Sequence, residues 1–151
     1  MLRDFTSDDQ AQVQALVDAG MRERWGDAYD PACNPDLDDL TANYVDGGAQ
    51  VVVLELDGRI VASGILVPES TERGRILRMS VDAQHRREGH GARLVDELVR
   101  RARACGMTEL VVRTDTPWTS ALAMYRSCGF DEVGDDGVDT HFSMSLRSPD
   151  T

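Results

Sequence analysis

A glycine-punctuated stretch near the middle of the chain, Arg-Arg-Glu-Gly-His-Gly-Ala at 86–92, has the residue types of a phosphate-binding loop. It follows an apolar run at 76–81 and precedes a segment whose apolar residues fall on one helical face. The first N–H groups of a helix have no partner within it, and the helix dipole favours negative charge there. Gly89 and Gly91 place no side chain in the way of a phosphate, while the two arginines add permanent positive charge. The pattern predicts a phosphate site, and more specifically a site for a pyrophosphate.

Three phosphate-binding motifs can be compared with this stretch. A dinucleotide-binding fingerprint needs a third glycine three residues after Gly91, where this chain has Leu94. A nucleotide-binding P-loop needs Gly-Lys-Ser/Thr, and no lysine occurs nearby. The third motif, Arg/Gln-x-x-Gly-x-Gly/Ala, fits Arg86-x-x-Gly89-x-Gly91. In this motif the chain resembles the GNAT superfamily of N-acetyltransferases, whose loop of that form binds the pyrophosphate of acetyl-CoA.

A second motif about thirty residues later supports the same resemblance. The run at 121–130 has an alanine four residues before Tyr125 and Gly129-Phe130 after it, as in the second signature of this superfamily. The two motifs occur in the family's order and are separated by an expected strand at 110–114. Seven residues before the tyrosine, where relatives often have asparagine, this chain has Trp118. The resemblance is detailed from residue 76 onward and extends to the amino-terminal half in layout only.

The resemblance implies a role for each part of these motifs. Backbone groups of Met79 and Val81 would pair with the pantetheine arm of acetyl-CoA, as if it were an added strand. The same strand would offer an N–H group to the thioester oxygen as negative charge builds on it. Tyr125 matches the family's general acid, and its phenol, with an ordinary pKa of about 10, is protonated at neutral pH. The expected cofactor contacts are Met79, Ser80, Val81, Arg86, Arg87, Glu88, Gly89, His90, Gly91, Ala92 and Trp118.

No residue stands out as the base that would deprotonate the acceptor amine. Many relatives carry a glutamate on the strand before the loop, but the expected strand at 75–81 contains neither an acid nor a histidine. Glu72 precedes that strand, and His141, with an ordinary pKa of about 6.5, begins the last one. Deprotonation through ordered water is the default, with these two residues as alternatives. His85 and His90, in or beside the loop, are expected to contact ligand or solvent.

The surrounding elements predict an α/β (α+β) fold with a mixed, mostly antiparallel central sheet flanked by helices, the GNAT type. Apolar runs at 50–56 and 59–67 are joined by Asp57-Gly58, a strong hairpin signal, and a third strand follows. Three antiparallel strands before a strand–loop–helix unit argue against a doubly wound fold. In the first half we also expect a strand at 2–5, a helix after Thr6 with Gly20 as a candidate break, and a short helix from Asn34. In the second half we expect a long helix ending at Cys105 and a helix capped by Thr119 or Ser120 and ended by Gly129. Two final strands are expected at 130–133 and 141–146.

Length and composition are those of one globular domain. The 151 residues, 41% hydrophobic and 28% charged, are enough to bury a core, and we expect one domain at 1–147 with a loose tail at 148–151. No apolar run is long enough to span a membrane and the polar start is unlike a signal peptide, which predicts a cytoplasmic location. The spacing of Cys33, Cys105 and Cys128 predicts free thiols and no metal site. The net charge of −11 argues against binding to nucleic acid.

These observations predict an enzyme that moves an acetyl group from acetyl-CoA to a primary amine by direct attack. The acceptor would be a small molecule or a peptide amine, and the acidic balance fits a cationic one. The family's layout places the region 22–33 beside the acceptor, with Glu23, Trp25, Asp27, Tyr29 and Asp30 as candidate contacts. The identity of the acceptor and the oligomeric state, a homodimer included, stay open. The alternative is a non-catalytic acyl-CoA-binding or sensing module, which would keep the glycine loop but has no need of Tyr125.

Overall fold

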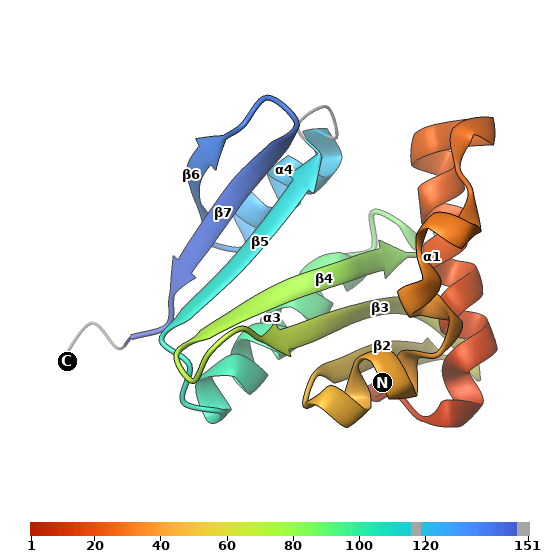
Figure 1. Ribbon diagram of the computed structural model, residues 1–151, viewed down its shortest axis with the longest axis horizontal. Coiled ribbons are helices and arrows are strands. Elements are labelled where there is room, and N and C mark those ends of the chain that lie inside the picture. The colour runs from red at the N-terminus through yellow and green to blue at the C-terminus, as the bar shows by residue number, and fades with distance from the viewer. Residues whose placement is uncertain (116–118, 148–151) are drawn as a thin grey trace.

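The computed structural model describes residues 1–115 and 119–147, so Trp118 and the expected tail at 148–151 lie outside the described residues. The described residues form a seven-stranded sheet in the order β1-β2-β3-β4-β5-β7-β6 (Figure 1). Its strands are β1 Leu2–Asp4, β2 Gln50–Leu56, β3 Arg59–Pro68, β4 Arg73–Val81, β5 Glu109–Asp115, β6 Asp131–Asp135 and β7 Asp139–Ser145. Neighbouring strands run antiparallel except β4 and β5, which are parallel. The expected mixed, mostly antiparallel sheet is confirmed.

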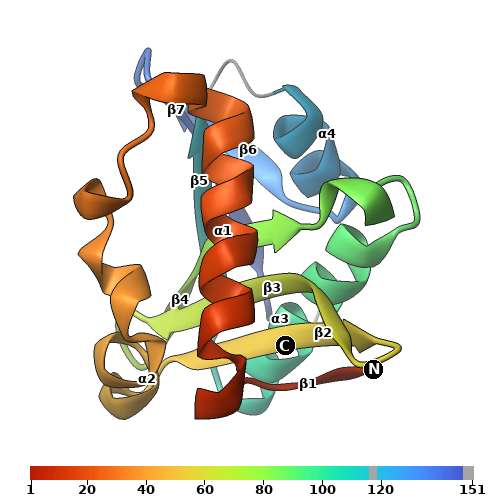
Figure 2. The same ribbon diagram turned by 90° about the vertical axis from the view of Figure 1, so that its right-hand side faces the viewer.

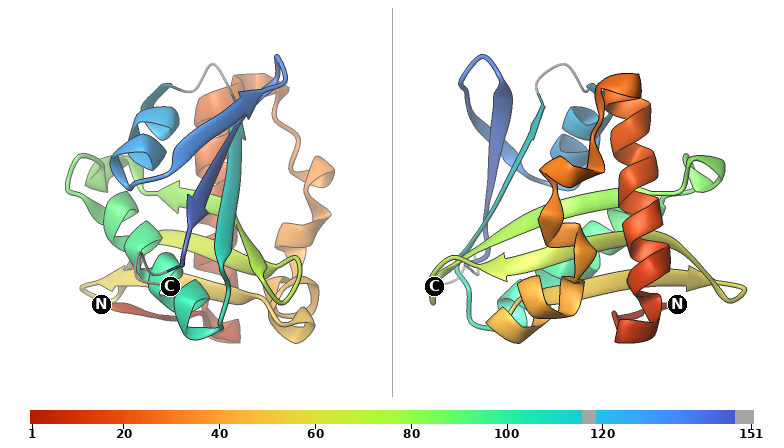
Figure 3. Two further views of the ribbon diagram at one scale, coloured as in Figure 1. Left: turned by 90° about the vertical axis from the view of Figure 1, so that its left-hand side faces the viewer. Right: turned by 45° about the vertical axis from the view of Figure 1, so that its right-hand side comes forward.

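Helices cover both faces of this sheet. They are α1 Gln10–Trp25, α2 Leu40–Asn43, α3 His90–Ala104 and α4 Thr119–Ser127, with short 3-10 turns between them. Figure 2 shows α1 crossing in front of the strands, and the left view of Figure 3 shows α3 and α4 together on the opposite face. Val13 and Val17 of α1 are buried in a core on one face, while Leu94 and Leu98 of α3 are buried in a larger core on the other. The amphipathic pattern after the glycine loop thus forms the helix that was predicted.

The hairpin between β2 and β3 turns at the predicted dipeptide. Asp57 and Gly58 have positive φ values of 51° and 80°, as a two-residue type I′ turn requires. The register then pairs Leu56 with Arg59 and continues along both strands, with one irregularity at Leu54–Glu55. This hairpin and β4 form the three antiparallel strands that were expected before the loop.

Two local predictions were wrong, and a third was correct in position but not in the type of helix. Gly20 does not break α1, which is continuous to Trp25. A glycine inside a helix costs about 1 kcal/mol, and here a Cβ would lie 3.8 Å from Ser80 Oγ, so the residue sits against the sheet. The short helix expected from Asn34 is a 3-10 turn at Pro35–Asp38, with α2 beginning only at Leu40. Neither Thr119 nor Ser120 is the N-cap of α4, because the helix already begins at Thr119.

The two halves of the sheet diverge at the junction of β4 and β5. These strands pair only at Arg73 with Glu109, Gly74 with Leu110 and Arg75 with Val111. Beyond this short ladder they separate, as Figure 1 shows, so the later part of β4 is paired with β3 alone among the described strands. Their facing backbone groups are therefore available to an extended ligand. In the described part of the chain, no helix has the length and apolar character needed to cross a membrane.

Candidate active site

A β-bulge sits where β4 separates from β5. The register between β3 and β4 shifts between Ser63 and Ile65, and Arg78 adopts a positive φ of 54°. A non-glycine residue in this region costs roughly 1–2 kcal/mol, and such local strain is often kept at functional sites. Gly64 of β3 leaves room for the side chain that follows Arg78, because a Cβ there would overlap the sulfur of Met79. The bulge changes the direction of β4 at the point where the sheet opens.

The side chains after the bulge alternate between the two faces of the sheet. Met79 and Val81 pack against the core on the α3 face, whereas Ser80 lies next to Gly20 of α1. Their backbone groups therefore lie in the plane of the sheet, along the side of β4 that faces the divergence from β5. This arrangement is the one required for Met79 and Val81 to pair with an extended ligand.

The glycine loop connects β4 to α3 through a sequence of left-handed residues. Arg87 and Gly89 have φ values of 65° and 83°, and α3 begins at His90. Successive backbone N–H groups in such a conformation form a concave anion-binding surface, which the N-terminus of α3 extends. Gly91 has a different role: a Cβ there would meet Met124 Sδ of α4 at 2.8 Å, so the glycine allows α3 and α4 to approach closely. Gly89 thus permits the left-handed backbone of the loop, whereas Gly91 permits the close packing of two helices.

Arg86 is not free to point at a ligand in this state. Its guanidinium forms an ion pair with Glu23 of α1, and its Nη2 donates to Val81 O at 3.4 Å. The hydrogen bond between the two side chains raises the pKa of Arg86 and lowers the pKa of Glu23. Glu23, expected near the acceptor, is therefore in contact with the loop. A pyrophosphate would compete with this carboxylate for the guanidinium.

Tyr125 lies in the core between α4 and the second half of the sheet. Its ring is 5.8 Å from both Phe130 and Phe142, edge-on to the first and tilted to the second. The residue is only 4% exposed, and burial raises the pKa of its phenol well above the ordinary value. The positive charge of Arg24, near the end of α1, lowers this pKa. The hydroxyl is therefore fully protonated at any physiological pH, as a proton donor must be.

The structure separates the two residues considered as bases from the loop end of β4. Glu72 precedes β4 at its paired end, where its carbonyl accepts from the backbone N–H groups of Thr108 and Glu109. At about 3.3 Å per residue, roughly 20 Å of strand lie between Glu72 and the bulge at Arg78. His141 alternates with the buried Phe142 on β7, so its ring is on the opposite side of the strand from Tyr125. Neither residue is placed for the chemistry, which leaves ordered water as the default.

A polar network beside the bulge was not predicted from the sequence. The Arg78 guanidinium donates to Asp36 Oδ1 and to Asn34 Oδ1, both at 3.0 Å, and Tyr44 donates to Asp36 Oδ2 at 2.6 Å. These contacts attach the segment before α2 to β4 across more than forty positions of sequence. The sequence shows Arg78 as one of three arginines in β4, which gave no indication of its partners.

A cavity of about 370 Å³ lies next to this network, between the end of α1 and the segment at 28–34. Its walls combine apolar surface from Met21, Ala28 and the half-exposed Trp25 with the polar side chains of Tyr29 and Asp30. The Tyr29 hydroxyl donates to Asp18 at 2.5 Å, and its ring lies under the Arg22 guanidinium. Of the candidate acceptor contacts, Trp25, Tyr29 and Asp30 line this cavity and Asp27 is not among its lining residues, so contact with an acceptor stays a prediction.

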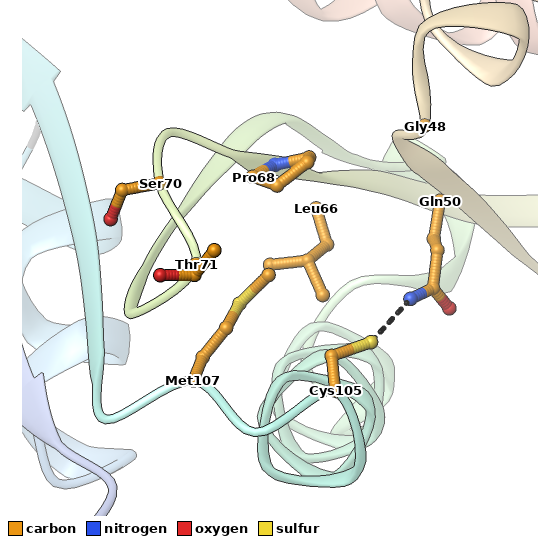
Figure 4. A pocket seen from close by; sticks show the side chains of 8 residues that line it. All are labelled: Gly48, Gln50, Leu66, Pro68, Ser70, Thr71, Cys105 and Met107. Atoms are coloured by element: carbon orange, nitrogen blue, oxygen red, sulfur yellow. Dashed lines mark hydrogen bonds between the residues drawn. The ribbon is translucent and has the colours of Figure 1, made fainter.

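A second cavity, of about 350 Å³, is remote from these groups. Figure 4 shows it between the C-terminal end of α3 and the turn that joins β3 to β4, with Met107 and Leu66 on its walls. Gln50 donates to the Cys105 thiol there at 3.4 Å. The free thiols predicted for Cys33, Cys105 and Cys128 are confirmed, and burial raises the pKa of Cys128.

Comparison with known proteins agrees with this geometry. The model of the acetyltransferase (GNAT) family matches residues 13–130. N-acetyltransferase 8 from Homo sapiens is 29% identical over 75% of this chain and 52% of its own length, and its Rattus norvegicus counterpart is 31% identical over 76% and 54%. The chain therefore spans about half the length of these curated relatives.

Solved structures show the same fold. A GNAT-family acetyltransferase from Staphylococcus aureus Mu50 superposes with a TM-score of 0.86 at 16% identity, covering 97% of this chain and 99% of that one. The PaiA N-acetyltransferase from Thermoplasma acidophilum, solved in complex with coenzyme A, gives 0.83 at 12% identity over 96% and 98%. The family model covers most of the chain, and the bulged β4 that separates from β5 is followed by a left-handed loop at the start of α3. The chain therefore belongs to the GNAT acetyltransferase family.

Proposed function

We propose that this chain transfers an acetyl group from acetyl-CoA to a primary amine. The observation that carries the proposal is that the diverging strands and the anion-binding loop meet at the same end of β4. The loop at 86–92 would bind the pyrophosphate, with Arg87 and the N-terminus of α3 supplying positive charge. The pantetheine arm would extend along β4 and pair with the backbone of Met79 and Val81, as an added strand pairs with a sheet edge. Coenzyme A bound to the Thermoplasma acidophilum relative supports the choice of ligand.

The reaction needs three contributions from the protein. The nitrogen of a neutral amine attacks the thioester carbon, forming a C–N bond and leaving negative charge on the oxygen, which a backbone N–H of β4 would stabilise. The C–S bond then breaks, and the sulfur takes the proton of the Tyr125 hydroxyl. The nitrogen loses its extra proton through ordered water, and a proton returns to Tyr125. The products are the amide and free CoA thiol.

Burial affects how Tyr125 would work. A thiol has an ordinary pKa of about 8.5, below that of a phenol, so proton transfer from Tyr125 to the thiolate is uphill before any environmental effect. Burial and the neighbouring Cys128 increase this difference, while the charge of Arg24 reduces it. We therefore assign Arg24 a supporting role, in which its positive charge favours the phenolate that forms as the sulfur is protonated.

For the acceptor we propose a cationic amine with an apolar substituent, as the cavity at the end of α1 combines both kinds of surface. Trp25 and Met21 would contact the apolar part, and the acidic side chains nearby would attract the ammonium group before it loses its proton. Such steering weakens with salt, because the Debye length falls from about 10 Å at 0.1 M to about 3 Å at 1 M. The acidic balance of the chain also supports a small-molecule or peptide acceptor over nucleic acid.

The test is an acceptor screen that follows release of free CoA thiol, run together with thermal unfolding in acetyl-CoA. At a hundredfold its Kd the ligand should stabilise the fold by about 2.7 kcal/mol, and Arg87→Gln, which removes an exposed positive charge from the loop, should reduce this gain. Cationic amines should be the better acceptors, with a kcat/KM that falls as salt rises. Stabilisation by acetyl-CoA without turnover of any amine would favour the alternative, a non-catalytic acyl-CoA-binding module. A gain that is unchanged in Arg87→Gln would argue that this loop does not bind the pyrophosphate.

A further inference from the structure

We propose that His85, Glu88 and His90 form a binding site for a divalent transition-metal ion, of which Zn²⁺ is the simplest case. One donor atom from each side chain lies within 4.8 Å of the other two. Two imidazole nitrogens and a carboxylate oxygen are a common ligand set for zinc, which also accepts water as a fourth ligand. This site goes beyond the acetyl-transfer proposal and revises the expectation, drawn from the cysteines, that the chain holds no metal.

The separations between the donor atoms fit a tetrahedral ion. With metal–ligand distances of about 2.0–2.1 Å, two tetrahedral ligands lie roughly 3.3 Å apart. Glu88 Oε2 is 2.8 Å from His90 Nε2 and 3.4 Å from His85 Nδ1, so both pairs are already close to that value. Only the two imidazoles must move closer together. His85 can do so by side-chain rotation, because it lies on a short turn and is partly exposed.

The backbone holds one of the three ligands rigidly. His90 is the first residue of α3 and is 8% exposed, so packing sets the orientation of its ring. Its Nδ1 is buried and has no hydrogen-bond partner within the described residues, whereas Nε2 faces Glu88. The left-handed residues Arg87 and Gly89 place Glu88 between the two histidines. Glu88 is half-exposed, which leaves a path for the ion and room for water in the fourth position.

A simpler reading is that the carboxylate accepts hydrogen bonds from both imidazoles and thereby holds the loop without any ion. The two readings differ in what titration with metal shows. Zn²⁺ should bind the metal-free, untagged protein with one ion per chain in calorimetry, without acetyl-CoA present. The result is therefore independent of the acetyl-transfer proposal.

Variants at the three positions identify the ligands. Loss of a second-shell partner typically weakens metal binding 10–100-fold, so loss of a direct ligand should weaken it by about 100-fold or more. We expect this for Glu88→Gln and His85→Asn, which change exposed side chains, and for His90→Gln, provided that circular dichroism shows it to be folded. The matched control is His141→Asn: His141 contacts Asp136 at 3.1 Å and lies outside the three-residue cluster, so its loss should leave the affinity unchanged.

Cobalt distinguishes this site from the cysteines. Co²⁺ bound to nitrogen and oxygen in a four-coordinate site gives visible absorption bands without the near-ultraviolet charge-transfer band of a thiolate ligand. A thiolate band, or a Zn²⁺ affinity in Glu88→Gln equal to that of the wild type, would overturn the proposal. Binding that is lost in the loop variants and kept in His141→Asn would support it.

Discussion

Replacing Tyr125 by phenylalanine separates a catalytic hydroxyl from a structural ring. The change keeps both ring contacts at 5.8 Å, to Phe130 and Phe142, and removes one oxygen from a residue that is 4% exposed. A single hydrogen bond contributes about 0.5–1.5 kcal/mol to stability, which corresponds to a melting-temperature change of a few degrees at most in a domain of this size. If the hydroxyl protonates the leaving thiolate, kcat should instead fall by about 10²-fold, or roughly 2.7 kcal/mol in the transition state.

Both quantities can be measured on one preparation. Release of CoA thiol at saturating substrates gives kcat, a burst experiment shows whether chemistry limits it, and thermal unfolding gives stability. Because burial raises the pKa of Tyr125, wild-type kcat should show no loss from its deprotonation up to pH 10. Phe130→Leu is the matched control, since it weakens the same packing and should lower the melting temperature while keeping most of kcat. Near-full kcat in Tyr125→Phe under chemistry-limited conditions would refute the assignment and leave solvent as the proton donor.

Three further predictions concern the loop and its surroundings. Gly89→Ala should lose about 1–2 kcal/mol of stability in denaturant unfolding, because its φ of 83° is unfavourable for alanine even though a Cβ would meet nothing within 4 Å. Gly47→Ala is the control and should be near neutral, since a Cβ there also meets nothing and φ is not positive. Glu23→Gln should release Arg86 and so tighten acetyl-CoA binding about 2–5-fold in calorimetry, because an exposed ion pair contributes about 0.2–1 kcal/mol. An unchanged affinity would mean that Arg86 does not reach the ligand. Two arginines lower the pKa of Glu97 to about 2, so its ion pairs should add about 1–2 kcal/mol to the free energy of unfolding above pH 4.5. The difference in stability between the wild type and Glu97→Gln should therefore disappear as the pH falls through 2.

Local sequence signals predicted the elements well, because each depends on residues close together in the chain. Asp57-Gly58 determines its own turn, and the spacing of Leu94 and Leu98 determines which face of α3 is buried. Gly20 shows the limit of this reasoning, since packing against the sheet outweighed its low helix propensity.

The site was only half predictable for a related reason. The loop motif and Tyr125 are local patterns, but the partners of the charged groups are not. Arg86 pairs with a glutamate 63 positions away, and Arg78 with an aspartate 42 positions away. The bulge at Arg78 depends on the register with β3, which no single strand reveals. His85, Glu88 and His90 are close together in the sequence, but only the left-handed loop brings their donor atoms together.

The divergence of β4 and β5 also bears on association between molecules. A strand edge with unsatisfied N–H and C=O groups is a template for another chain, and proteins protect their edges with short or charged strands. The outer edges here follow that rule, since β1 has three residues and β6, with sequence Asp-Glu-Val-Gly-Asp, carries three acids. The divergence creates two inner edges that face each other, so a second protein chain could reach them only by inserting a strand between β4 and β5. Because the protein's own architecture shields these inner edges, they can remain unpaired without being shortened as β1 is.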